Sequence, residues 1–261
     1  MNNYIIGESE LEECKKIFKE KFLNKEYPEL CGNIEQQIEK FCKEFDFSNL
    51  SKDKYRELCA QSSTSDEDGT YLAHLIYVII WGNWEFNAYG IDYVDGAWKS
   101  SMYGGETINT YATLIGKIKE TIDDKENEII EKFKIKYLTI GNFMVLPKIY
   151  FNNQTLNQIK GCQYKDLMDI FLYNIFDNNS KFQELVELHN LNSKDFCIKN
   201  FLEPYFDIAN NYTPIEVIYH NGELNNNNIY NKDFVLDYVI KSMNIIDYRA
   251  ERICAILKDR L

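Results

Sequence analysis

The chain has 261 residues, of which 45% are apolar and 15% aromatic, and its formal net charge at pH 7 is −12. This much apolar surface argues against an intrinsically disordered protein and is enough for a sizeable core without disulfide or metal staples. The acidic balance disfavours nucleic acid as a partner, because phosphate backbones repel a negatively charged protein.

The cysteines and histidines give no metal-binding pattern. The seven cysteines contain no C-x-x-C pair, and the three histidines have no second His or Cys at ligand spacing. We therefore expect reduced, mostly buried thiols, no metal and no cofactor. The opening residues lack a secretory signal pattern, and the apolar stretch 71–84 is too short to cross a bilayer, so we expect a cytoplasmic protein without membrane contact.

Apolar residues at helical spacing predict the first elements. Helices are expected over Glu8–Asn24 and Asn33–Phe45, with a short one near 55–59. The small, acidic segment 62–69 is typical of a loop that caps a buried helix beginning near Thr70.

The helical pattern stops between Glu85 and Gly105, where glycines and aromatic residues have no helical period. This segment is either a long aromatic loop or a pair of short strands, and long loops inside compact domains are often functional. Helices are then expected over Glu106–Lys119, entered from Gly104-Gly105, and over Asp123–Lys136.

The remaining pattern is helical with short extended pieces. A strand is predicted at Phe143–Leu146 and another at 215–219, and the closing helix runs from Lys232 to about Lys258. The helices predicted between them cover 164–176, 180–189 and 193–201. The fold class is therefore mainly α, a single globular helical domain with a few short strands, spanning 1–261 with an N-terminal helical segment 1–61 and a body 70–261.

The first candidate site is a pocket between the aromatic segment and the helix start that follows it. Aromatic walls and the bare N–H groups of a helix N-terminus together suit a small ligand. The alternative is that the aromatic side chains pack under a long loop and that the polar residues only cap the helix. The residues concerned are Tyr89, Asp92, Tyr93, Trp98, Glu106 and Thr107.

The second candidate site flanks the predicted strand at Phe143–Leu146. Asn142 follows Gly141 before this strand, and Asn157 and Lys160-Gly161 come after it, as polar residues and glycines of ligand-binding loops often do. The structural alternative is that Asn142 holds a left-handed turn and Asn157 caps a helix.

The third candidate is a pair of arginines in the closing helix. Arg249 and Arg252 lie three residues apart, which places them on one helix face, where they could hold an anion together. The alternative is ordinary salt bridges to Asp247, Glu251 or Asp259.

Several segments together resemble a known but uncharacterised family of bacterial proteins. These are GGETINTYATLIG, YLTIGNFMVLPK, TLNQIKG, the stretch 166–171 and IIDYRAERICAIL, from about residue 70 to the C-terminus. Members of the family share a TIGNF-x-x-LP core. Many have a His where this chain has Tyr137-Leu138, and an Arg where it has Lys160. The resemblance implies no activity. If that His were a catalytic base, its loss would leave this chain inactive or would show that the residue was never catalytic.

We expect a non-catalytic protein of the bacterial cytoplasm that binds a protein or small molecule through the aromatic segment 85–110. The alternative is an enzyme acting on a nucleotide or other phosphorylated small molecule, with Glu106 or Asp92 as base and Lys160, Arg249 or Arg252 for the anion. A component of a bacterial stress or phage-defence system is a third hypothesis, which gene neighbourhood would test.

Overall fold

A computed structural model describes residues 8–47, 49, 75–76, 78–80, 91–94, 97–100, 103–107, 115–116, 118–147, 193–207, 213–214 and 231–261. The chain divides into two compact units, neither of which is a continuous stretch. Unit 1 comprises Met1–Glu106, Leu138–Ile149 and Ala250–Leu261, and unit 2 comprises Thr107–Tyr137 and Tyr150–Arg249. The predicted single domain, with its segments 1–61 and 70–261, stays a prediction.

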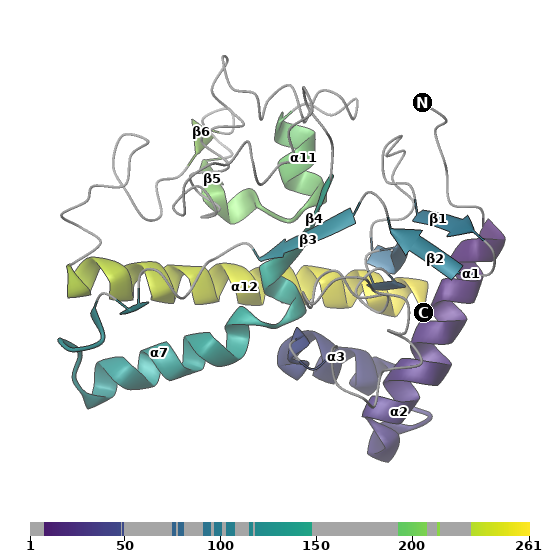
Figure 1. Ribbon diagram of the computed structural model, residues 1–261, viewed down its shortest axis with the longest axis horizontal. Helices are drawn as coiled ribbons and strands as arrows, with labels where there is room; N and C mark the ends of the chain where they lie inside the picture. The colour runs from purple at the N-terminus through teal and green to yellow at the C-terminus, as the bar shows by residue number, and fades with distance from the viewer. Residues whose placement is uncertain are drawn as a thin grey trace. The chain divides into compact units, whose positions relative to one another are not determined.

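Unit 1 begins with an almost unbroken helical stretch (Figure 1). The helix α1 (Glu8–Ile17) continues into a π-helical turn η1 (Phe18–Leu23) and a last short turn α2 (Asn24–Glu26). The predicted helix over Glu8–Asn24 is thus confirmed, with a widened turn inside it that helical periodicity does not announce.

The second predicted helix is also confirmed. After the 3-10 turn η2 (Pro28–Leu30), the helix α3 spans Ile34–Glu44. Its first turn is capped by the Asn33 side chain, whose Oδ1 accepts a hydrogen bond from the Gln36 amide at 3.2 Å. Gly32 precedes this cap with φ +93, a left-handed conformation that glycine adopts without steric cost.

Aromatic rings form the core of this part of unit 1. The ring of Phe41 lies 5.3 Å from that of Phe18, 5.7 Å from Phe22 and 6.2 Å from Phe47, and all four side chains are buried. Phe47 in turn stacks on Phe143 at 4.5 Å. Edge-on and offset contacts at these separations add to the hydrophobic gain of burial.

A buried amide closes the helical stretch against α3. The Gln37 side chain is 1% exposed, and its Nε2 donates toward the Leu23 carbonyl, the Asn24 Oδ1 and the Tyr27 carbonyl at 3.4, 3.1 and 3.2 Å. The Leu23 and Tyr27 carbonyls also accept the backbone N–H groups of Tyr27 and Leu30 at 2.9 and 3.0 Å, so Gln37 adds a second donor to each. One side chain from α3 therefore serves the end of the preceding helix.

The described strands of unit 1 form two-stranded sheets. The hairpin β1 (Ile91–Val94) and β2 (Ala97–Ser100) is one two-stranded sheet, and β3 (Tyr103–Thr107) pairs with β4 (Phe143–Pro147) in another. The 3-10 turn η6 (Ile140–Asn142) leads into β4, where the sequence predicts a strand over Phe143–Leu146. Residues 75, 76 and 78–80, in the helix predicted from Thr70, are helical and buried.

One boundary predicted from the sequence is wrong. Glu106 and Thr107 are the last residues of β3, whereas the sequence pattern places them at the start of a helix over Glu106–Lys119. Helical residues in that stretch are described at 115, 116 and 118. Gly104 and Gly105 disfavour a helix, and the pairing of β3 with β4 satisfies backbone groups that a helix start leaves open.

Unit 2 contains two long helical pieces and a small polar corner. The helix α7 spans Asp124–Tyr137, and α12 spans Lys232–Arg260, of which the residues up to Arg249 belong to this unit. The shorter elements are α11 (Ser193–Lys199), η7 (Glu203–Tyr205), and the antiparallel pair β5 (Phe206–Asp207) and β6 (Thr213–Pro214). The predicted helices over Asp123–Lys136, 193–201 and 232–258 are confirmed.

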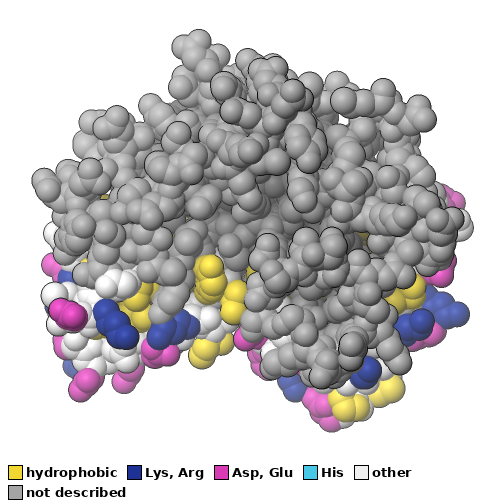
Figure 2. All heavy atoms as spheres, viewed as in Figure 1, with side chains coloured by type: hydrophobic (Ala, Val, Ile, Leu, Met, Phe, Trp, Pro, Cys, Tyr) yellow, Lys and Arg dark blue, Asp and Glu magenta, His cyan; other side chains and the backbone are white. Residues whose placement is uncertain are grey.

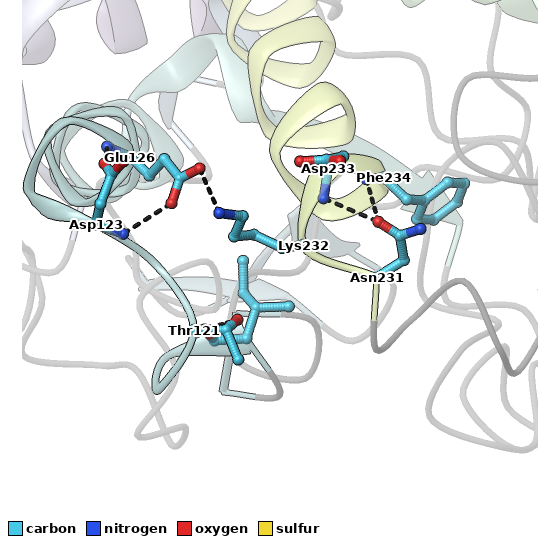
Figure 3. A network of polar contacts seen from close by, with 8 residues as sticks. Thr121, Asp123, Glu126, Asn231, Lys232, Asp233 and Phe234 are labelled. Carbon is cyan, nitrogen blue, oxygen red and sulfur yellow. Dashed lines mark hydrogen bonds and ion pairs between the residues drawn. The ribbon is translucent and has the colours of Figure 1, made fainter.

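The starts of α7 and α12 share a polar network (Figure 3). Asp123 and Glu126 form a reciprocal cap, in which each carboxylate accepts the other residue's backbone N–H at 2.9 and 2.7 Å. Glu126 also pairs with Lys232 Nζ at 2.8 Å, and the Lys232 hydrogen bond lowers the pKa of the Glu126 carboxyl. The two helices therefore begin side by side, and a second ion pair, between Lys136 and Asp247, joins them further along.

The described residues are mainly helical, which confirms the expected fold class at that level. Within the described ranges, no helix is long and apolar enough to span a bilayer. On the part of the surface that Figure 2 colours, Lys and Arg side chains are interspersed with Asp and Glu, without a large area of one sign.

Replacing Phe41 by alanine should lower the free energy of unfolding by about 3–5 kcal/mol, because it opens a cavity among the packed rings. The change is measured by urea titration followed by far-ultraviolet circular dichroism. Ile135→Ala is the control, since this side chain is 67% exposed and its loss should cost less than about 0.5 kcal/mol. Equal losses in the two variants would contradict the assignment of Phe41 to the core.

Asn231→Ala should destabilise the protein by about 1 kcal/mol through loss of the α12 cap. The Asn231 Oδ1 accepts from the backbone N–H groups of Asp233 and Phe234 at 3.0 and 3.3 Å (Figure 3). Asn231→Asp keeps the acceptor and should stay near the wild-type stability in the same urea titration. A loss for Asp as large as that for Ala would show that the side-chain acceptor does not carry the effect.

Candidate functional site

The backbone brings two of the predicted binding residues directly opposite each other. In the β1–β2 hairpin, Tyr93 is in register with Trp98 and Asp92 with Lys99. Residues at opposite register positions of an antiparallel pair occupy the same face of the sheet. Tyr93 and Trp98 therefore share one face of the hairpin, and Asp92 and Lys99 share the other. Tyr89 lies outside the described residues.

Glu106 and Thr107 belong to a different sheet. They end β3, which pairs with β4, whereas the hairpin strands pair with each other. The pocket expected between an aromatic loop and a helix N-terminus thus loses its helix N-terminus at these two residues. The described backbone places Tyr93 and Trp98 at paired positions of the hairpin, and a ligand-binding role for them stays a prediction.

The second candidate site is described only at Asn142. This residue is fully buried at the end of η6, and its backbone N–H donates to the Thr139 carbonyl at 2.9 Å. It therefore belongs to the tight 3-10 turn that leads into β4. The left-handed turn suggested as the structural alternative is wrong, because among the described non-glycine residues a positive φ occurs at Phe201 and not at Asn142. Asn157 and Lys160 lie outside the described residues.

The two arginines of the third candidate differ in environment. Arg249 is fully buried, while Arg252, one turn later, is exposed. The Arg249 Nε donates to the backbone carbonyl of Asn200 at 3.0 Å. Asp247, one of the acids proposed as an arginine partner, forms an ion pair with Lys136. The two guanidinium groups therefore do not share one environment. Their spacing places them on one side of the helix, but Arg249 is packed in the interior and Arg252 is not.

The acceptor of Arg249 lies at the carboxyl end of α11. There the Leu202 amide donates to the Cys197 carbonyl at 2.9 Å and the Phe201 amide to the Ile198 carbonyl at 3.1 Å, with Phe201 at φ 57. These two bonds around a left-handed residue form a Schellman motif, which serves some of the carbonyls at a helix end. Arg249 serves the Asn200 carbonyl that follows, where the helix macrodipole favours a cation. Its described contact therefore has a structural role.

Two cysteine side chains contact each other between α3 and the final turns of α12, both within unit 1. Cys42 on α3 and Cys254 on α12 are in hydrogen-bonding contact. Cys42 is 1% exposed, whereas Cys254 is partly exposed, and neither is in a disulfide. Beside them, Lys258 forms an ion pair with Glu39.

The two thiols differ in their tendency to ionise. The hydrogen bond from Cys42 lowers the pKa of Cys254 to about 7, with help from the charges of Lys258 and Lys43 and against the effects of burial and of Glu39. The pKa of Cys42 is raised well above its usual value, first by its hydrogen bond to Cys254 and then by burial. Near pH 7 the partly exposed Cys254 is therefore a thiolate in about half of the molecules, next to a protonated Cys42 thiol.

Sequence reasoning missed this pair because its members are far apart in the chain and neither has a neighbouring cysteine. A usable signal lay in the helical spacing: Glu39, Cys42 and Lys43 share one face of α3, as Cys254 and Lys258 share one face of α12. These two patterns could not be matched without knowing that the helices are neighbours.

The comparisons with known proteins leave these sites without an established relative. No family model, no curated protein and no solved structure matches the chain. The resemblance to the family with the TIGNF-x-x-LP core therefore stays a prediction. Within the described ranges, no cluster of His, Cys, Asp and Glu side chains is arranged to hold a metal ion.

Arg249→Met should reduce the free energy of unfolding by about 2–3 kcal/mol, because it removes a buried charged hydrogen bond and deprives the Asn200 carbonyl of this donor. Arg252→Met is a matched control one turn away, with an exposed side chain and an expected change within about 0.5 kcal/mol. Urea titration of both variants measures the difference. Similar small changes in both would mean that Arg249 does not anchor α11.

Proposed function

We propose that this is a non-catalytic binding protein whose contact surface is the aromatic segment 85–110, centred on the β1–β2 hairpin. The observation that supports it is the register that pairs Tyr93 with Trp98 on one face of the hairpin. Tyr and Trp are the residues most enriched among those that dominate binding energy at interfaces. Two of them side by side on a short ribbon form a compact anchor for a protein or small-molecule partner.

The hairpin also suits recognition by its construction. It is a two-stranded sheet of four residues per strand, and such ribbons gain little stability by themselves. The opposite charges of Asp92 and Lys99 occupy the second face at another register position. An aromatic face and a charged face on one ribbon give a partner both an apolar anchor and polar contacts that fix orientation.

The enzyme alternative for a nucleotide or other phosphorylated substrate draws on Arg249 to hold the anion. Burial of that guanidinium against the Asn200 carbonyl supports binding over this alternative, because the Arg249 Nε already has a structural acceptor. A bacterial, cytoplasmic setting is part of the proposal. It rests on the family resemblance, and cell fractionation would test it.

The proposal is tested with Trp98→Ala and Tyr93→Ala in the full chain, expressed with an affinity tag in its own cells. Native mass spectrometry of the gently purified protein records any retained small molecule, and quantitative co-purification records protein partners. Each alanine variant should reduce the retained partner at least about tenfold, as expected for a loss of ~1.4 kcal/mol or more. The melting temperature should stay within about 2 °C of wild type.

Two controls separate binding from folding in this experiment. Ser100→Ala changes the same strand without removing an aromatic ring and should retain the partner. Trp98→Phe keeps a ring and should restore part of the binding. Full retention of the partner by both alanine variants, or a fall of more than about 5 °C in melting temperature, would overturn the proposal and assign Tyr93 and Trp98 to the core.

A further inference from the structure

Two contacts fix how α3 meets the final turns of α12 within unit 1. Glu39 pairs with Lys258, and Cys42 contacts Cys254. Cys42 lies three residues after Glu39 on α3, whereas its partner Cys254 lies four residues before Lys258 on α12. The two helices are therefore antiparallel here. Each contact therefore lies one turn from the other on the same seam, and the thiols are held in place by an ion pair beside them.

The seam contains the parts that a reactive dithiol requires. One thiol is partly exposed and can meet a solute, while the other is buried and in contact with it. Among the described residues, the charged groups that act on Cys254 are Lys258 on its own helix and Lys43 and Glu39 on α3. Cationic neighbours stabilise a thiolate, and the thiolate is the form that attacks peroxides and disulfides.

We propose that Cys254 and Cys42 are an oxidation-sensitive dithiol that reacts with hydrogen peroxide and closes to a disulfide, which fastens α3 to the last turns of α12. This assigns a covalent modification site that is independent of the binding surface at the hairpin. Its reactants are the two thiols and a peroxide.

The reaction balances in two steps. The Cys254 thiolate attacks one peroxide oxygen, the O–O bond breaks, and the sulfur becomes a sulfenic acid while hydroxide leaves and takes up a proton as water. The Cys42 sulfur then attacks the sulfenic sulfur, the S–O bond breaks, and the departing hydroxide combines with the Cys42 proton as a second water. One peroxide is reduced, two thiols are oxidised, and a thiol reductant reverses the change.

Closure joins two neighbouring sulfur atoms. The sulfur atoms are already in hydrogen-bonding contact, and a disulfide requires them to approach to ~2.05 Å. Both residues lie on helices whose neighbouring turns are joined by the Glu39–Lys258 pair, so the pairing partner of Cys254 is set before the reaction begins. The bridge would then form within one molecule.

The first experiment treats the reduced full chain with a small excess of hydrogen peroxide, blocks remaining thiols and maps the tryptic peptides by mass spectrometry. The expected product is peptide 41–43 joined to peptide 253–258, restored to free peptides by dithiothreitol. Absence of this pair, or cross-links spread over other cysteines, would overturn the proposal. Cys31→Ser, at an exposed cysteine outside the seam, is the matched control and should give the same linked pair.

The second experiment separates the attacking thiol from the resolving one. The labelling is done at pH ~9, near the usual cysteine pKa, so that the Cys254 thiolate forms even without the hydrogen bond from Cys42. In Cys42→Ala the sulfenic acid on Cys254 should then persist and be trapped by dimedone at a yield at least about tenfold above wild type, since no neighbouring thiol consumes it. In Cys254→Ser the linked pair should vanish, and Cys42 should react little because it is buried. Circular dichroism confirms that each variant is folded. Rapid labelling of Cys42 with dimedone in a folded Cys254→Ser protein would contradict the assigned order.

A third readout follows the charge at the seam. The rate at which iodoacetamide labels Cys254 should rise with pH through a midpoint of about 7, the pKa of that thiol, because only the thiolate reacts. Lys258→Met should move the midpoint to higher pH, and Lys258→Arg should restore it. Lys241→Met, on the same helix but paired with Asp237, should leave it unchanged. An unmoved midpoint in Lys258→Met would remove the seam's electrostatic role and overturn the proposal.

Discussion

Burial of one face of α12 is the constraint on which the described structure depends most. In unit 2 this helix buries Val235, Tyr238, Val239 and Ile246, and in unit 1 it buries Ile253 and Leu257. The apolar residues recur every three or four positions along the whole element, so one helical period serves two sets of neighbours. Two other helices form ion pairs with α12. The first turn of α7 does so through Glu126 and Lys232, and α3 does so through Glu39 and Lys258.

Long polar side chains repeatedly serve backbone carbonyls at the ends of helical segments that lie elsewhere in the sequence. Gln37 donates to carbonyls after the π-helical turn, Arg249 to the carbonyl after α11, and Arg260 to the Ile80 carbonyl at 2.6 Å. The Tyr27 carbonyl already accepts the Leu30 amide, so Gln37 adds a second bond there, and a buried polar side chain left without such an acceptor would cost more than the hydrogen bond itself contributes. Polar burial in these places therefore specifies which helix end meets which neighbour.

The positions of several helices could be predicted from the sequence, whereas the tertiary contacts between them could not. The helices over Glu8–Asn24, Asn33–Phe45 and Asp123–Lys136 were predictable because local periodicity and caps such as Asn33 act within a few residues. The β3 strand at Glu106 was missed, since its partner β4 is far along the chain and strand pairing overrides a local helix start. Of the candidate site, the hairpin register of Tyr93 and Trp98 could be suspected, whereas the burial of Arg249 and the contact of Cys42 with Cys254 depend on tertiary packing.

The π-helical turn at Phe18–Leu23 shifts the phase of the first helical stretch. In an α-helix each residue is rotated by about 100° from the one before it. Phe22 would then lie close to the face of Phe18, but Leu23 would be turned well away from it. A wider turn slows that rotation, and here Phe18, Phe22 and Leu23 are all fully buried. The segment thus resembles an α-helix with a one-residue insertion. The buried face after the turn is therefore one residue out of phase with the buried face before it.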